Sequence, residues 1–183
     1  MRILAISGSL RHDSYNTQLL RFARELAPPD AEIELYEDLV EIPPYDQDVQ
    51  DSDVPAVVAD LRERIAAADA LLIATPEYNG SVPGVLKNAI DWASRPFPDN
   101  SLRNKAVAVI GASTGAYGGI WAQADLRRIL GIAGARVVEG NVAVPHAAEQ
   151  FDAEGWLVDA QLRHELGELL RDLSAQVELR AAA

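Results

Sequence analysis

Three short stretches of this sequence are rich in groups that can hold a ligand through hydrogen bonds. They are SGSLRHDSYNT at residues 7–17, TPEYNGSVPGVLKNAIDW at residues 75–92, and GASTGAYGG at residues 111–119. The chain has no cysteine, and its three histidines (His12, His146 and His164) are too scattered to indicate a metal site. The stretches therefore indicate binding of a polar ligand, with a single candidate nucleophile, Ser113.

The first stretch follows an apolar run and precedes a helical pattern. It lacks the G-x-G-x-x-G spacing of dinucleotide-binding loops and the G-x-x-x-x-G-K spacing of P-loops. Free backbone N–H groups at a helix start attract anions, and hydroxyl, amide and guanidinium side chains can add hydrogen bonds. These side chains are Ser9, Arg11, Ser14, Asn16 and Thr17. The pattern predicts a phosphate site; the alternative is that Asp13 or Ser14 only caps the helix and Arg11 is solvated.

The second stretch places three polar or aromatic residues between two prolines and two glycines. A plain turn would account for Pro76, Pro83 and the glycines. It would not account for the intervening Glu77, Tyr78 and Asn79. Backbone amides of such a loop can meet the polar edge of a heteroaromatic ring while Tyr78 packs beside it.

The third stretch contains G-x-S-x-G, the nucleophile-elbow pattern of serine hydrolases. A catalytic triad would need Asp125 or Asp159 together with His146 or His164. No HGGG-like segment that could supply an oxyanion hole precedes Ser113, and this hypothesis leaves the first two stretches without a role. A glycine-rich turn without any ligand is the third possibility.

Length and charge restrict the functional classes. The chain has 183 residues, which suits a single domain spanning 1–183. Its 28 acidic and 16 basic residues give a net charge of −12, which disfavours nucleic acid and anionic membranes as partners. The apolar run near the N-terminus is too short for a signal sequence or a membrane span, so a cytoplasmic location is expected.

Apolar runs alternate with helical patterns along the chain. The expected strands are residues 2–6, 32–37, 70–74, 105–111 and 137–144, the last interrupted near Gly140. The expected helices are residues 19–26, 57–68, 85–90, 119–132 and 162–177. This alternation predicts an α/β fold with a parallel sheet covered on both faces. The first, third and fourth strands should be central and the second nearer an edge, with ligands at the carboxyl ends of the strands.

Four segments in this order carry a family resemblance: GSLRHDSYN, LVEIPPYDQDVQ, TPEYNGSVPGVLKNAIDW and ASTGAYGG. Together they resemble the NADPH-dependent FMN reductases, and among these the bacterial chromate and quinone reductases. The resemblance covers residues 2–131. It implies a flavodoxin-like fold with a five-stranded parallel sheet in the order 2-1-3-4-5, and FMN as the cofactor.

The resemblance also implies a role for each of the three stretches. The first would hold the FMN phosphate, the second would wrap the isoalloxazine ring, and the third would lie beside the flavin. The residues so assigned are Ser9, Arg11, Ser14, Tyr15, Asn16 and Thr17; Pro76, Glu77, Tyr78 and Asn79; and Ser113, Thr114, Gly115 and Gly118. Close relatives often carry a second aromatic residue where this chain has Gly80, so its ring face is expected to be more open.

The implied activity is that of an NAD(P)H oxidoreductase. Hydride would pass from NADPH or NADH to the flavin, and from the reduced flavin to a quinone-like, azo, metal-oxyanion or free flavin acceptor, in a ping-pong reaction. The flavin would carry the chemistry, so no catalytic side chain is expected. A flavodoxin-type electron carrier, which exchanges electrons with partner proteins, is the alternative.

Two aromatic residues suggest self-association. Trp92 and Phe97 lie near a proline-rich loop where a monomer would leave them partly exposed, and aromatic residues are enriched at interface cores. The resemblance also implies oligomers, so a homodimer or homotetramer is expected, with each flavin beside the subunit boundary. The alternative is that Trp92 packs inward on its own sheet.

Overall fold

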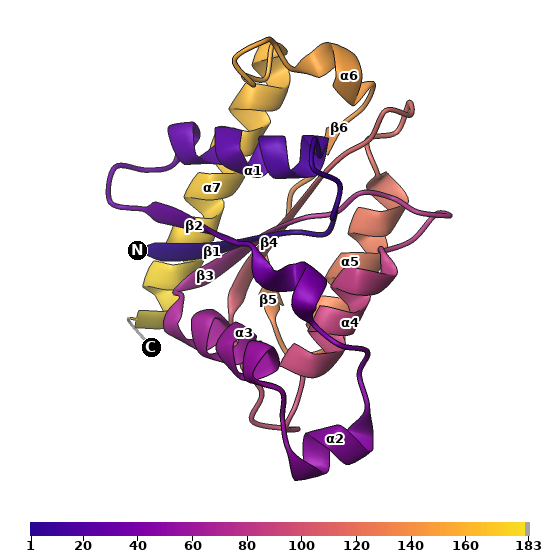
Figure 1. Ribbon diagram of the computed structural model, residues 1–183. Coiled ribbons are helices and arrows are strands. Elements are labelled where there is room, and N and C mark those ends of the chain that lie inside the picture. Colours follow the sequence, from indigo (N-terminus) through magenta and orange to yellow (C-terminus); the bar gives the residue numbers. More distant parts are fainter. Residues whose placement is uncertain (182–183) are drawn as a thin grey trace.

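The fold is a parallel β-sheet between two layers of helices (Figure 1). The computed structural model describes residues 1–181, with side chains for residues 1–179. The sheet has the order β2-β1-β3-β4-β5, with β6 also paired to β4, and all pairs are parallel. Its strands are β1 (Arg2–Ser7), β2 (Glu32–Tyr36), β3 (Ala70–Ala74), β4 (Ala106–Ala112), β5 (Arg136–Val137) and β6 (Val142–Val144). The predicted order 2-1-3-4-5 is confirmed.

Strand burial follows the sequence pattern. Strands β3 and β4 are buried at every residue, and β1 is buried everywhere except at Arg2. Strand β2 alternates exposed glutamates with buried or half-buried residues, which suits its place at the edge of the sheet. The central and edge positions are therefore those predicted.

The helices divide between the two faces of the sheet (Figure 1). Helices α1 and α7 pack in one apolar core, and helices α3, α4 and α5 pack in the other. The helices are α1 (Tyr15–Leu26), η1 (Asp38–Glu41, a 3-10 helix), α2 (Gln47–Ser52), α3 (Ala56–Ala67), α4 (Gly84–Ala93), α5 (Ile120–Ile132), α6 (Ala147–Gln150) and α7 (Ala160–Ala181). None of the helices within residues 1–181 is long and apolar enough to cross a membrane.

The fifth position of the sheet is divided in two. The sequence predicts one strand interrupted near Gly140, and the structure places β5 beside the start of β4 and β6 beside its end. Between them, the guanidinium of Arg127 donates hydrogen bonds to the carbonyls of Val109 and Gly140. Burial lowers the pKa of this guanidinium. Arg127 thus supplies a hydrogen-bond donor to the Val109 carbonyl of β4 at the gap between β5 and β6.

Trp92 corrects one prediction. Its side chain is 0% exposed, its indole N–H donates to the carbonyl of Pro43 at 2.8 Å, and the Tyr45 ring packs edge-on at 4.9 Å. The expectation that a monomer leaves Trp92 partly exposed is wrong, because the segment between η1 and α2 covers it. Phe97 is 78% exposed.

Candidate functional site

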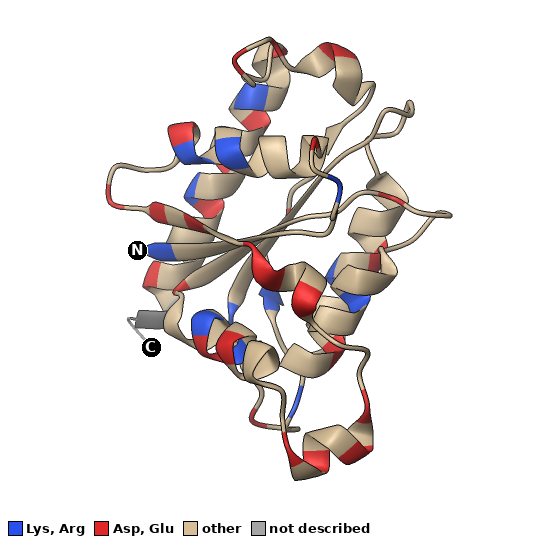
Figure 2. Cartoon of the chain, viewed as in Figure 1, with Lys and Arg blue, Asp and Glu red and all other residues tan. Residues whose placement is uncertain are grey.

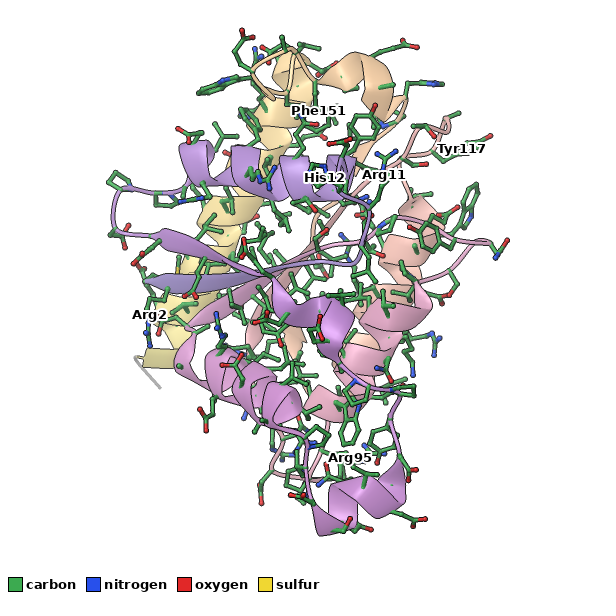
Figure 3. The ribbon with its side chains drawn as sticks, in the orientation of Figure 1. Arg2, Arg11, His12, Arg95, Tyr117 and Phe151 are labelled. Carbon is green, nitrogen blue, oxygen red and sulfur yellow. The ribbon has the colours of Figure 1, made fainter. Side chains whose placement is uncertain are left out.

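The three ligand-type stretches meet at the carboxyl edge of the sheet. They enclose a cavity of about 220 Å³, beside the N-terminal end of α1 where Figure 3 labels Arg11 and His12. Its lining residues are Ser9, Arg11, Ser14, Tyr15, Asn16, Pro76, Glu77, Tyr78, Ala112, Ser113 and Thr114. The remaining predicted site residues, Thr17, Asn79, Gly115 and Gly118, lie outside this lining. Ala112 also lines the cavity; an alanine at the end of an apolar run carries no signal for ligand binding, and it was not predicted.

Hydroxyl groups fold the first loop onto the sheet. Ser14 is the N-cap of α1 and accepts a hydrogen bond from the Thr17 N–H at 3.4 Å. The Thr17 hydroxyl donates to the Ser7 hydroxyl at 2.8 Å, while the Gly8 N–H donates to the Ala74 carbonyl at 2.8 Å. Ser14 therefore caps α1, as the alternative without a ligand predicted. It also borders the cavity.

Arg11 is the cation of this cavity. Its guanidinium lies 5.1 Å from the centre of the Tyr15 ring and donates to the carbonyl of Asp13. It forms no ion pair with any carboxylate among the described residues. A cation without a carboxylate partner, beside the start of a helix, creates a local preference for an anion.

Asn16 joins the first loop to the third. Its side-chain amide donates to the Ala112 carbonyl at 2.9 Å and accepts from the Ala112 N–H at 2.9 Å. Strand β3 ends at Ala74, opposite Ile110, and the Thr75 N–H still reaches the Ile110 carbonyl. The next backbone groups on this side of β4 belong to Ala112, so the amide of Asn16 takes the place of a neighbouring strand. The sequence did not predict this role.

Glu77 joins the second loop to α5. Its carboxylate accepts hydrogen bonds from the Trp121 and Ala122 N–H groups at 3.0 and 3.2 Å. Helix α5 begins after Gly119, which has no side chain to cap it, and an anion is favourable at a helix N-terminus. The side chain of Glu77 thus caps α5, while the residue also borders the cavity.

The second loop continues in a tight turn. Tyr78 and Ser81 exchange backbone hydrogen bonds at 3.1 and 3.2 Å, and the two residues between them have φ angles of 54° and 75°, as paired left-handed turns require. This turn holds Asn79 away from the cavity. The Ser81 hydroxyl donates to Asp125 at 2.7 Å, and this hydrogen bond lowers the pKa of the Asp125 carboxyl.

The third loop is held by its backbone. The Ser113 N–H donates to the Val144 carbonyl at 3.0 Å, and the Ala147 N–H donates to the Ser113 carbonyl at 3.0 Å. The Ser113 hydroxyl accepts from the Gly115 N–H at 3.1 Å. Gly118 does not line the cavity because it packs on the backbone of Ala143 and Val144.

The serine-hydrolase alternative lacks its partners. Within the described side chains, no histidine forms a hydrogen bond with Ser113. Asp125 is held by Ser81 and Arg128, and Asp159 caps α7 through the Gln161 and Leu162 N–H groups. Ser113 therefore has no adjacent base to activate it.

Two exposed aromatic residues stand near the second loop. The rings of Tyr117 and Trp121 meet edge-on at 4.9 Å, and Figure 3 labels Tyr117 on the side of the molecule near α5. Trp121 lies close to the second loop because its backbone N–H donates a hydrogen bond to the Glu77 carboxylate. Neither residue was predicted from the sequence, although large aromatic side chains in a glycine-rich loop and the helical turn after it are a signal for contact with a ligand or a partner.

The charge of the cavity differs from that of the whole molecule. Acidic residues are spread over the helices and over β2 (Figure 2). In the cavity, Arg11 and Glu77 are the charged side chains of the lining, and the carboxylate of Glu77 is occupied by α5. The cavity thus offers one available cation within a chain of net charge −12.

Comparisons with known proteins agree with this geometry. The sequence profile of the family described as NADPH-dependent FMN reductase matches residues 1–149. The chain is 45% identical over 178 residues to an NAD(P)H-dependent FMN reductase of Pseudomonas aeruginosa, covering 97% of this chain and 95% of that protein. It is 40% identical over 178 residues to a 2-hydroxy-1,4-benzoquinone reductase of a Burkholderia species, covering 97% and 96%.

A solved structure extends the likeness to three dimensions. The flavoenzyme NAD(P)H:(acceptor) oxidoreductase FerB of Paracoccus denitrificans matches with a TM-score of 0.85 at 36% sequence identity. The match covers 97% of each chain.

Proposed function

The chain belongs to the NADPH-dependent FMN reductase family, and from that premise we propose that it is an FMN-dependent NAD(P)H oxidoreductase acting on small acceptors by a ping-pong reaction. Quinone-like, azo, metal-oxyanion and free flavin acceptors are the proposed classes. One observation carries the proposal: three loops converge on a cavity whose available charge is the cation of Arg11. Bound FMN supplies the hydride-transfer chemistry.

The phosphate end of FMN fits the first loop. A phosphate needs a cation and several donors, and Arg11, the hydroxyls of Ser9 and Ser14, and the N–H groups at the start of α1 border the same space. Tyr15 holds Arg11 in place through its ring. We assign these residues to the phosphate, with Asn16 and Thr17 as residues that fix the loop.

The ring end of FMN fits the second and third loops. Pro76, Glu77 and Tyr78 border one part of the cavity, while Ser113 and Thr114 border another. The carboxylate of Glu77 is turned to α5, Pro76 has no N–H, and the N–H groups of Tyr78 and Ser113 are bound by the carbonyls of Ser81 and Val144. The polar edge of the ring would therefore meet the N–H groups of Glu77 and Thr114, which would stabilise negative charge on the ring. These residues bind and orient the ring, and none is required as an acid or base.

Direct reduction of the bound flavin by NADPH or NADH distinguishes a reductase from an electron carrier. Purified protein loaded with FMN should lose its yellow colour when NADPH or NADH is added without oxygen and without a partner enzyme. Photoreduction of the same sample serves as the control that the flavin can be reduced. Failure of both nicotinamides, with successful photoreduction, would favour the flavodoxin-type carrier.

Replacing Arg11 by alanine is expected to weaken FMN binding by about 1.5–3 kcal/mol, the usual range for a hydrogen bond to a charged group. The loss should exceed that of a surface charge because the guanidinium of Arg11 borders the cavity assigned to FMN. Arg24→Ala removes the same charge from the exposed side of α1 and is the matched control. Flavin dissociation constants measured by fluorescence would contradict the assignment if the two variants behaved alike.

We also propose that the chain forms a homodimer or homotetramer through the face between α4 and α5. A groove of about 540 Å³ lies there, bordered by the exposed side chains of Phe97 and Ile132. Its charged residues nearly balance, with Lys87, Arg95 and Arg128 against Asp91 and Asp125. A chain of net charge −12 can meet a second copy more easily on such a face.

Sedimentation tests this interface. The double variant Phe97→Asp/Ile132→Asp is expected to sediment as a monomer at micromolar concentration, because each substitution replaces an apolar side chain of the contact by a carboxylate that must lose its water on association. Val40→Asp changes an equally apolar exposed residue away from the groove and should leave the oligomer intact. A monomeric wild-type protein loaded with flavin would end the proposal.

A further inference from the structure

A second cavity lies along α1 and adjoins the first. It has a volume of about 560 Å³ and shares Arg11, Ser14 and Tyr15 with the cavity assigned to FMN. From these residues it follows the outer side of α1 as far as Glu25 and is closed by the loop at residues 153–156. Tyr15 and Glu25 are ten positions apart, which corresponds to about 15 Å of helix. The second cavity therefore leads away from the first as a groove, rather than enlarging it.

Trp156 forms a fixed flat surface at the far end of this groove. The Asp152 carboxylate accepts hydrogen bonds from the Glu154 and Trp156 N–H groups at 3.1 and 2.7 Å, and the Asp152 N–H donates to the Trp156 carbonyl at 3.0 Å. One side of the indole packs edge-on against Phe22 at 5.6 Å, yet the side chain remains 46% exposed. A rigid aromatic face of this kind can stack on a purine base.

The polar groups of the groove match the rest of a nucleotide. Arg21, Glu25 and the side chain of Glu154 line the groove and form no ion pair or hydrogen bond with any side chain that the structure describes. Carboxylates can accept hydrogen bonds from ribose hydroxyls, as in dinucleotide-binding folds. Arg21 provides a cation for the phosphate groups of the dinucleotide, which a chain of net charge −12 would otherwise repel.

We propose that this groove binds the adenosine half of the nicotinamide dinucleotide, with Trp156 stacked on the adenine and Arg21 beside the phosphates. The inference rests on the proposed function, because it assigns a position to that reaction's hydride donor. Binding energy from a remote part of a substrate can hold its reacting part in place. The two cavities share Arg11, Ser14 and Tyr15 and are therefore adjacent. A dinucleotide with its adenosine in the groove and its nicotinamide in the first cavity requires this.

Steady-state kinetics of the FMN-loaded enzyme with two hydride donors test the proposal. NADPH and NADH carry adenosine, whereas reduced nicotinamide mononucleotide does not. Trp156→Ala is expected to raise the KM for the dinucleotides about tenfold, as expected for loss of one base-stacking contact. The KM for the mononucleotide and the flavin affinity should not change, and Trp156→Phe should restore most of the loss.

A pair of arginine variants tests the groove without disturbing Trp156. Arg21→Ala should raise the KM for the dinucleotides only, whereas Arg24→Ala, which removes the same charge from outside the groove, should not. ADP-ribose should compete with NADPH and not with the reduced mononucleotide.

Two results would overturn the proposal. One is an equal effect of Trp156→Ala and Arg21→Ala on both donors, or no effect on either. The other is an effect confined to the KM of the electron acceptor, which would assign the groove to that substrate. Failure of the proposed function is distinguishable, because then neither donor would reduce the flavin of the wild-type enzyme.

Discussion

Asn16→Ala is expected to destabilise the folded protein by about 2–6 kcal/mol and to weaken flavin binding, because it leaves two buried backbone groups without partners. Asn16 is 3% exposed, so the two hydrogen bonds it forms with Ala112 are largely shielded from solvent. Each unsatisfied buried group costs about 1–3 kcal/mol. The effect exceeds that of most single substitutions, which cost about 0.5–3 kcal/mol.

The flavin effect follows from the position of Ala112. Ala112 ends β4 and immediately precedes Ser113 and Thr114, while Asn16 lies in the first turn of α1, directly after the first loop. Loss of the amide would free both loops at the point where they enclose the cavity. Asn16 thus acts on the flavin by positioning, in addition to any contact of its own.

Chemical denaturation and flavin titration would measure the two effects. Gln161→Ala removes an amide that hydrogen-bonds Glu165 on the exposed side of α7 and should change stability by less than about 0.5 kcal/mol. If Asn16→Ala unfolded at the same denaturant concentration as this control, the hydrogen bonds to Ala112 would carry no net stability.

The strands were predictable because their information is local. Ala70–Ala74 is an uninterrupted apolar run and is buried throughout. The glutamates that alternate with apolar residues in Glu32–Tyr36 indicate a half-exposed edge strand. The order of the strands came from the family resemblance. The short elements η1, α2 and α6 were missed, since four to six residues carry too little periodic pattern.

The site was predictable only in part, because several of its hydrogen bonds join residues far apart in the sequence. The loops were located from residue types and their place after strands. Asn16 and Ala112 are 96 residues apart, and Glu77 and Trp121 are 44 apart, so no local pattern marks either pair. Trp92 was mispredicted for the same reason: Pro43, whose carbonyl binds its indole, is 49 residues earlier.

Gly118→Ala is expected to destabilise the protein by about 2–5 kcal/mol, since a left-handed backbone costs an alanine about 1–2 kcal/mol and overpacking adds about 1–3 kcal/mol. Gly118 has a φ angle of 60°. A Cβ at this position would lie 2.6 Å from the carbonyl carbon of Ala143 and 2.7 Å from the nitrogen of Val144. Both neighbours are backbone atoms of β6, so relief requires the strand itself to move.

Substitutions at two other glycines separate the two causes of the lost stability, which are the left-handed backbone and the overpacking. Gly80→Ala keeps the left-handed backbone (φ 75°) but meets no atom within 4 Å, so it should cost only about 1–2 kcal/mol. Gly131→Ala lies in α5 with open space around it and should stabilise the protein by about 0.5–1 kcal/mol. Thermal unfolding of the three variants should therefore rank Gly131→Ala above Gly80→Ala and Gly118→Ala last.

The flavin affinity of these glycine variants tests whether the third loop contributes to the cavity. Strand β6 holds the Ser113 N–H through the Val144 carbonyl, so a shift of β6 caused by Gly118→Ala would move Ser113 and weaken flavin binding as well as stability. Gly131→Ala, at the far end of α5, should leave flavin affinity unchanged. If Gly118→Ala lost stability yet bound FMN as the wild type does, the loop of Ser113 would not contribute to the flavin site, and the assignment of the third loop would fail.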